Sequence, residues 1–146
     1  MLNDVYNSKL LAFAGNISRI GTLENADATA KAHSKLCGSS ISVDLKMNGD
    51  VVEDFAQTVK ACALGQSAAS VVAANIVGAT AKEVRDARAQ MLAMLKHDGE
   101  PPSGRFDDLK FLAPVKDYKA RHASAMLVFD ALVDCLNQIE QKTKAA

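Results

Sequence analysis

The stretch Ile41–Lys60, ISVDLKMNGDVVEDFAQTVK, decides the fold of this chain. Its first half alternates strictly between apolar residues (Ile41, Val43, Leu45, Met47) and polar residues (Ser42, Asp44, Lys46, Asn48). This period of two is typical of a strand with one buried face. Asn48-Gly49 follows, the preferred pair for a two-residue type I′ turn. The stretch therefore predicts an antiparallel hairpin of strands 40–47 and 51–61.

The flanking segments extend this hairpin into a complete domain. Residues 28–36 also alternate and predict a third strand. Helical spacing of apolar residues, with a capping box at Thr80–Glu83, predicts helices over 3–14, 65–77, 81–97, 106–112 and 119–142. Because strands come early and helices late, we expect an α+β fold. It has a small three-stranded antiparallel sheet with helices packed on one face, in a single domain spanning 1–146.

Composition excludes several classes of protein. The 146 residues carry 17 basic and 17 acidic side chains, so there is no basic excess for binding nucleic acid. The most apolar stretch, 61–81, contains Gln66, Ser67, Ser70 and Asn75, so a buried helix explains it better than a membrane span. Three cysteines without a secretory signal predict reduced thiols and a cytoplasmic location.

Two of the cysteines flank the predicted hairpin. If Asn48-Gly49 forms the two-residue loop, Cys37 lies opposite Lys60, and Cys62 becomes its diagonal neighbour at roughly 7–8 Å between Cα atoms. A metal ion can bridge that separation, whereas a disulfide needs backbone movement. The same register sets Asp54 opposite the apolar Val43, which leaves a β-bulge as an alternative. Such a bulge would change which face of the hairpin Cys62 shares with Cys37.

The surroundings of these thiols indicate different roles. Cys62 precedes the N-terminus of a predicted helix, where amides and the helix dipole favour a thiolate. The alternative is that Cys37 and Cys62 are both small buried hydrophobes. Cys135 lies on the apolar stripe of the last helix and is expected to pack in the core. His122, near the start of that helix, is placed to reach the hairpin end.

Several segments resemble the iron–sulfur cluster assembly scaffold family, of the IscU, SufU and NifU N-terminal-domain type. The resemblance covers nearly the whole chain in order. The segments that carry it are Leu36–Ser39, the Asn48-Gly49 hairpin, Lys60–Ser70, Val77–Thr80 and the last helix after Arg121–Ser124. The most specific of them is a cysteine followed by a helix rich in serine and alanine.

The resemblance implies ligand positions, and the chain departs from two of them. The family's first two cysteines correspond to Cys37 and Cys62, but Ser39 replaces its aspartate. Its third cysteine corresponds to Ala123 if the preceding histidine is kept, or to Ser124 if the helix body is aligned. Cys135 comes about three turns too late to replace it.

These departures leave a reduced ligand set. It consists of Cys37 and Cys62, with His122 as the third ligand and Ser39 as a weak fourth. Such a set suits zinc with an open position, whereas an iron–sulfur cluster prefers four strong ligands. For a cluster, the reduced set implies that the cluster is labile, that a partner supplies a ligand, or that two subunits of a homodimer share it.

The resemblance implies a function without catalysis. The leading hypothesis is a scaffold or sulfur acceptor for iron–sulfur cluster assembly, binding a transient cluster or a zinc or iron ion. Its partners would be a cysteine desulfurase and iron–sulfur recipient proteins. One alternative is an adaptor that binds these partners without a cluster. Another is an enzyme with Cys62 as nucleophile and His122 as base.

Overall fold

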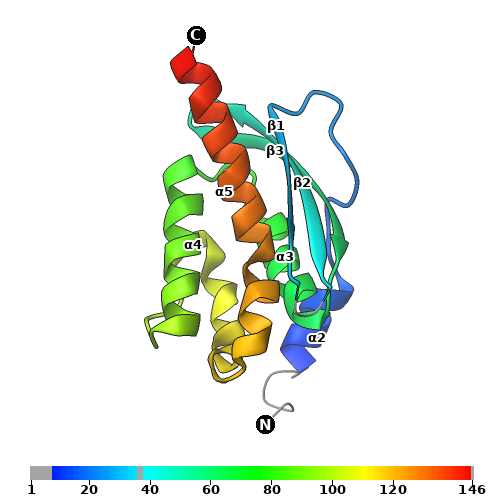
Figure 1. The fold of residues 1–146 in the computed structure, drawn as a ribbon, viewed down its shortest axis with the longest axis vertical. Helices are drawn as coiled ribbons and strands as arrows, with labels where there is room; N and C mark the ends of the chain where they lie inside the picture. The colour runs from blue at the N-terminus through cyan, green and yellow to red at the C-terminus, as the bar shows by residue number, and fades with distance from the viewer. Residues whose placement is uncertain (1–7, 36–37, 146) are drawn as a thin grey trace.

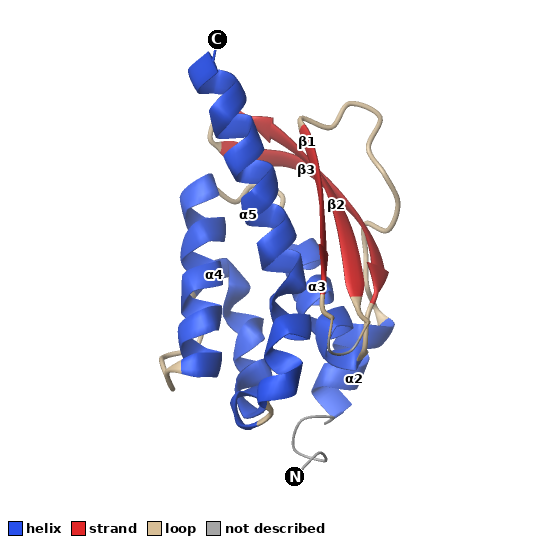
Figure 2. Cartoon of the chain, in the orientation of Figure 1, coloured by secondary structure: helices blue, strands red, loops and turns tan. Residues whose placement is uncertain are grey.

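The computed structural model of the chain describes residues 8–35 and 38–145. Figure 1 and Figure 2 show a sheet on one side and helices gathered on the other. In chain order the elements are α2 (Ser8–Gly15), β1 (Ala28–His33), β2 (Ser40–Asn48), β3 (Val51–Lys60), α3 (Ala63–Asn75), α4 (Ala81–Lys96), the 3-10 helices η1 (Gly104–Asp117) and η2 (Lys119–Arg121), and α5 (His122–Ala145).

The sheet has the order β1-β2-β3, and both pairings are antiparallel. This confirms the predicted α+β fold. The first strand is shorter than the predicted 28–36, because the chain turns after His33. The Ser34 amide there donates a hydrogen bond to the carbonyl of Ser39.

The hairpin turn lies one residue later than predicted. Asn48 pairs with Val51, so the two loop residues are Gly49 and Asp50 rather than Asn48 and Gly49. Gly49 has a φ of 61°, a left-handed value that glycine adopts at little cost. Asp50 does not share it, so the predicted type I′ turn, with positive φ at both loop positions, is wrong.

A bulge in β3 changes the register beyond the turn. Met47 pairs with Val52 but Lys46 pairs with Asp54, which leaves Glu53 as the extra residue. Phe55 then lies buried opposite Leu45, while Asp54 lies near the surface in an ion pair with Arg19. Burying a single unpaired carboxylate is expensive, so this arrangement has a clear physical reason.

The corrected register overturns one pairing near the cysteines. Ser40, not Cys37, lies opposite Lys60 at the end of the hairpin. Cys37 itself falls outside the described residues. The expected closeness of Cys37 and Cys62 therefore stays a prediction.

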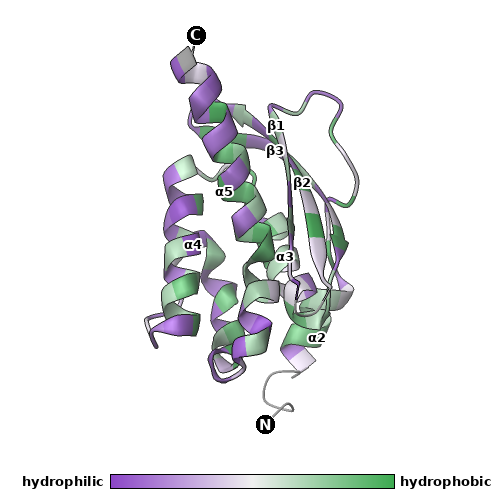
Figure 3. Ribbon diagram, viewed as in Figure 1, coloured by the Kyte–Doolittle hydropathy of each residue, from purple (hydrophilic) through white to green (hydrophobic). Residues whose placement is uncertain are grey.

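The helix α3 is buried along most of its length, between α2, α5, η1 and the sheet. Hydrophobic shades cover most of it in Figure 3, whereas α4 mixes hydrophobic and hydrophilic residues. The small residues of α3 allow this close packing. The hydroxyl of Ser67 in α3 lies within hydrogen-bond distance, 2.7 Å, of the carbonyl oxygens of both Leu10 and Ala63. Within 8–35 and 38–145, no helix has both the length and the apolar character that crossing a membrane requires.

The remaining helices follow their sequence signals with shifted ends. Thr80 and Glu83 form the predicted capping box at the start of α4. The short helix expected over 106–112 is instead the longer 3-10 segment η1, which packs against α3 and α4. α5 runs diagonally across β1 and β2, and its buried stripe completes the core.

Candidate functional site

Cys62 stands at the junction between β3 and α3. It is the N-cap residue of α3, with an extended backbone and no side-chain cap bond. Its own amide donates to the Ser39 hydroxyl at 3.3 Å, and its side chain is half-buried. Cys62 thus has the predicted position before the helix, where the amides of the first turn and the helix dipole favour negative charge.

Ser124 comes to the same place from the first turn of α5. Its Oγ lies 3.2 Å from the Sγ of Cys62, and either atom can be the donor. Its hydroxyl also donates to the Oγ of Ser39 at 3.4 Å. Ser39, Cys62 and Ser124, from three separate parts of the chain, thus form one cluster, called the Cys62 cluster below.

Of the two alternatives for the missing third thiol, Ser124 is the residue that lies against Cys62. Ser124 is 1% exposed and touches Cys62, whereas Ala123 is exposed. A sequence signal for this existed, because Ser124 shares the helical stripe of Val128, Ala131 and Cys135, all of them buried. The resemblance placed Ser39 at this site, but no sequence pattern indicated that its hydroxyl would join Cys62 to Ser124.

His122 is committed to other partners. It is 3% exposed, and its Nε2 lies 3.0 Å from the carbonyl oxygens of both Val115 and Lys116. Its Nδ1 lies 3.5 Å from the Nζ of Lys96. Both ring nitrogens are therefore engaged at the end of η1, and this geometry does not bring His122 into the Cys62 cluster.

The hydroxyl of Ser34 lies next to the Cys62 cluster. Ser34 is joined to Ser39 through its backbone amide, and its buried Oγ has no hydrogen-bond partner among residues 8–35 and 38–145. Buried polar atoms normally have a hydrogen-bond partner, so the Ser34 hydroxyl is a group at this end of the sheet that could form a further hydrogen bond.

The described donor set is weak for a metal. It comprises one thiol and two hydroxyls, and hydroxyls are not among the usual protein ligands of zinc or iron–sulfur clusters. Among residues 8–35 and 38–145, no group of three His, Cys, Asp or Glu side chains gathers where it could hold a metal ion. A stable site therefore needs donors beyond these three residues.

Cys135 is a core residue, as predicted. It is fully buried, and its thiol lies 3.7 Å from the carbonyl of Val43. Burial, helped by the carboxylates of Asp134 and Asp44, raises the pKa of the Cys135 thiol from 9.0 to about 12. The thiol therefore stays protonated at neutral pH and is a poor nucleophile.

Alkylation should distinguish this thiol from Cys62. With iodoacetamide at pH 8, we expect folded protein to keep Cys135 unmodified while Cys62 reacts, as read by peptide mass spectrometry. In denaturant both should react, because the raised pKa of Cys135 depends on the fold. Equal labelling of both residues in the folded protein would contradict the assignment.

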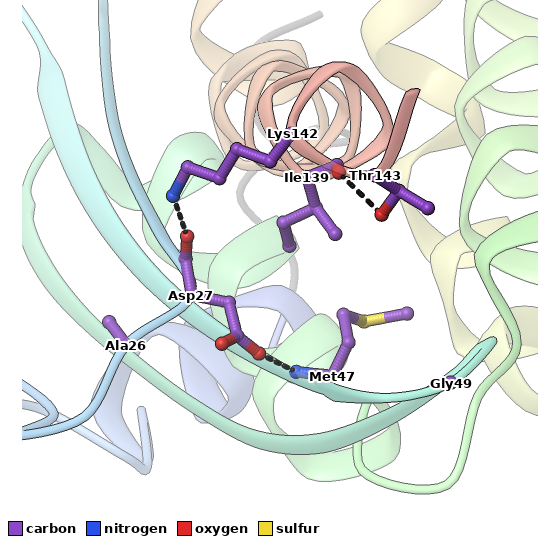
Figure 4. Close-up of a pocket in the computed structure, with 7 residues that line it drawn as sticks. All are labelled: Ala26, Asp27, Met47, Gly49, Ile139, Lys142 and Thr143. Atoms are coloured by element: carbon purple, nitrogen blue, oxygen red, sulfur yellow. Dashed lines mark hydrogen bonds between the residues drawn. The ribbon is translucent and has the colours of Figure 1, made fainter. Parts of the chain in front are cut away.

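A cavity of about 430 Å³ lies elsewhere in the molecule (Figure 4). It is lined by Ala26, Asp27, Met47, Gly49, Ile139, Lys142 and Thr143, between the hairpin and the end of α5. The length of β3, about 30 Å, separates it from Cys62. The Asp27 carboxylate accepts from the Met47 amide, and Lys142 donates to the Asp27 carbonyl, so its charged groups serve the fold.

Residues 5–125 match the family described as the NifU-like N-terminal domain, and the chain belongs to this family. It is 58% identical to a nitrogen-fixing NifU-like protein (N-terminal) from Brucella abortus, whose crystal structure superposes with a TM-score of 0.95. That match covers 97% of this chain and 98% of the other.

Two more distant relatives extend the comparison. The iron–sulfur cluster assembly scaffold protein IscU of Thermotoga maritima is 23% identical over 137 residues, covering 94% of this chain and 96% of the relative. A crystal structure described as a scaffold for the SUF system, from Fervidobacterium islandicum AW-1, shares the fold. Its TM-score is 0.84 at 20% identity, over 92% of this chain and 98% of the other.

Proposed function

We propose that this protein is a scaffold for iron–sulfur cluster assembly that holds its cargo weakly. The observation that carries the proposal is the convergence of Cys62, Ser39 and Ser124 at the N-terminus of α3. Family membership and the scaffold named among its relatives support it. Cys62 and Cys37 act as the thiolate ligands, and zinc is an alternative cargo of the same site.

The two serines explain why the cargo is held weakly. Ser39 stands where the family has an aspartate, and we assign Ser124, which touches Cys62, to the position of the family's third cysteine. Neither hydroxyl is a strong ligand at neutral pH, so part of the coordination comes from outside the chain. His122 is left out of the ligand set, because both its ring nitrogens already have partners.

The proposed partners follow from this incomplete set. A cysteine desulfurase supplies sulfur, and recipient proteins take the cluster with ligands of their own. A second copy of the chain is another source of the missing thiolates. We expect the protein to work in the cytoplasm together with these partners. In this role it performs no catalysis itself.

A second candidate function is an adaptor that binds the assembly partners and carries no cluster. The same two serines favour it, since they remove a carboxylate and a thiol from the site. The two functions differ in whether the folded chain retains metal and sulfide.

Anaerobic reconstitution separates them. Purified protein is loaded with ferrous iron and sulfide under reductant, desalted, and measured for iron, acid-labile sulfide and visible absorption. We expect iron and sulfide to be retained, and to be lost quickly to a chelator. Retention should fall as the pH is lowered, because protons compete for the thiolates. Absence of iron, sulfide and zinc from the loaded protein would leave the adaptor as the function.

A further inference from the structure

Gly65 is crowded although its backbone has no need of glycine. It lies in the first turn of α3, without the positive φ that would require glycine. A Cβ built there would lie 2.8 Å from the Ser124 Oγ, 3.1 Å from the Ser124 carbonyl oxygen and 2.8 Å from the Ala61 Cβ. Glycine inside a helix costs about 1 kcal/mol relative to alanine, so packing is the reason for it here.

The crowding is directed at the Cys62 cluster. Cys62 and Gly65 are three residues apart, so they share one face at the start of α3. Two of the three close contacts of the added Cβ would be made with Ser124, the residue whose hydroxyl touches the Cys62 sulfur. Because Gly65 has no side chain, the first turn of α5, with Ser124, can lie directly against the start of α3.

We propose that Gly65 is a positioning residue of the Cys62 site. The missing side chain lets residue 124 reach Cys62, so positions 65 and 124 together set which group stands beside the sulfur. As a statement about metal binding, the inference rests on the proposed function. As a statement about geometry, it stands on the contacts alone.

Gly65→Ala tests both aspects. The Cβ would push Ser124 and the start of α5 away from Cys62. Supporting groups around a metal site are typically worth 10–100-fold in affinity, so we expect zinc binding to weaken about tenfold. The probe is Zn²⁺ alone, titrated into reduced protein against a chromophoric chelator.

A cross-linking arm reads the geometry without metal. In a chain carrying Cys37→Ala and Ser124→Cys, mild oxidation should join residues 62 and 124 in a disulfide, identified by peptide mapping. Adding Gly65→Ala should prevent this bond, because sulfur atoms must come within about 2.05 Å of each other.

Gly99→Ala is the matched control, since a Cβ there would also be crowded, at 3.0 Å from the Cβ of Ala93 beside the end of α4. It should keep both zinc affinity and cross-linking. If Gly65→Ala does not fold, as judged by circular dichroism, Ala61→Gly is added to remove the contact that does not involve Ser124.

The outcomes separate the two proposals. A folded Gly65→Ala protein with unchanged zinc affinity and an unchanged cross-link would overturn the role of Gly65. If neither the unsubstituted protein nor Gly99→Ala binds zinc, zinc is not a cargo of this site, and the iron and sulfide reconstitution alone tests the proposed function. The cross-link alone then decides the role of Gly65.

Discussion

Cys62→Ala should remove measurable metal binding from the folded protein. The substitution deletes the only thiol of the Cys62 cluster among the described residues and leaves two hydroxyls there. Structural zinc sites with four ligands are worth about 10–16 kcal/mol, or roughly 3 kcal/mol per ligand, so one thiolate accounts for about 100-fold in affinity. Zinc titration and reconstituted iron and sulfide content both measure the loss.

Cys135→Ala is the matched control for this experiment. Its thiol is buried in the core and lies about 16 Å along α5 from Ser124, so metal content should not change. A Cys62→Ala protein with full metal content, while Cys37 is intact, would show that Cys62 is not a ligand.

Ser124→Cys should strengthen binding by a similar factor. The Ser124 Oγ lies 3.2 Å from the Cys62 Sγ, so a thiol at this position stands beside the proposed ligand Cys62. Thiolates are strong ligands of zinc and of iron–sulfur clusters. We expect zinc affinity to rise about 100-fold and the reconstituted cluster to survive a chelator for longer.

Ala123→Cys provides the comparison for this gain. Residue 123 is the other sequence candidate for the lost thiol, but it is exposed and next to the site only in sequence. It should bring little increase in affinity. A gain at 123 that equals or exceeds the gain at 124 would contradict the position assigned to Ser124.

The alternation in Ile41–Met47 predicted a strand with one buried face, because successive side chains of a strand point to opposite sides of the sheet. The Asn48-Gly49 pair after it predicted the turn of a hairpin. The exact register was beyond this pattern. It depends on the bulge at Glu53, and the bulge depends on which of Asp54 and Phe55 the surrounding helices can accommodate. The conflict itself was visible in the sequence as a carboxylate on an apolar face, but its resolution is a tertiary effect.

The candidate site was predictable to a similar extent. The position of Cys62 before α3 followed from the change of period after the hairpin, and the burial of Cys135 followed from its helical stripe. The direction of the His122 ring could not be predicted, because proximity along the chain to Ala123 and Ser124 says nothing of where the ring turns. The ring lies at the last carbonyls of η1, where its Nε2 is 3.0 Å from the oxygens of both Val115 and Lys116 and can donate to them.

The bulge at Glu53 also constrains how the length of this chain can vary. Val52 faces the core before the bulge, and Phe55 and Gln57 face it afterwards, so the two halves of β3 are out of phase by one residue. Losing one residue after the bulge, between Asp54 and Lys60, would shift Cys62 by one place against Ser39 and rotate it to the opposite face. The loop after α4, at residues 97–103, has no such coupling and can change length without moving the thiol. Length changes among relatives of this protein should therefore be found in that loop and not in β3.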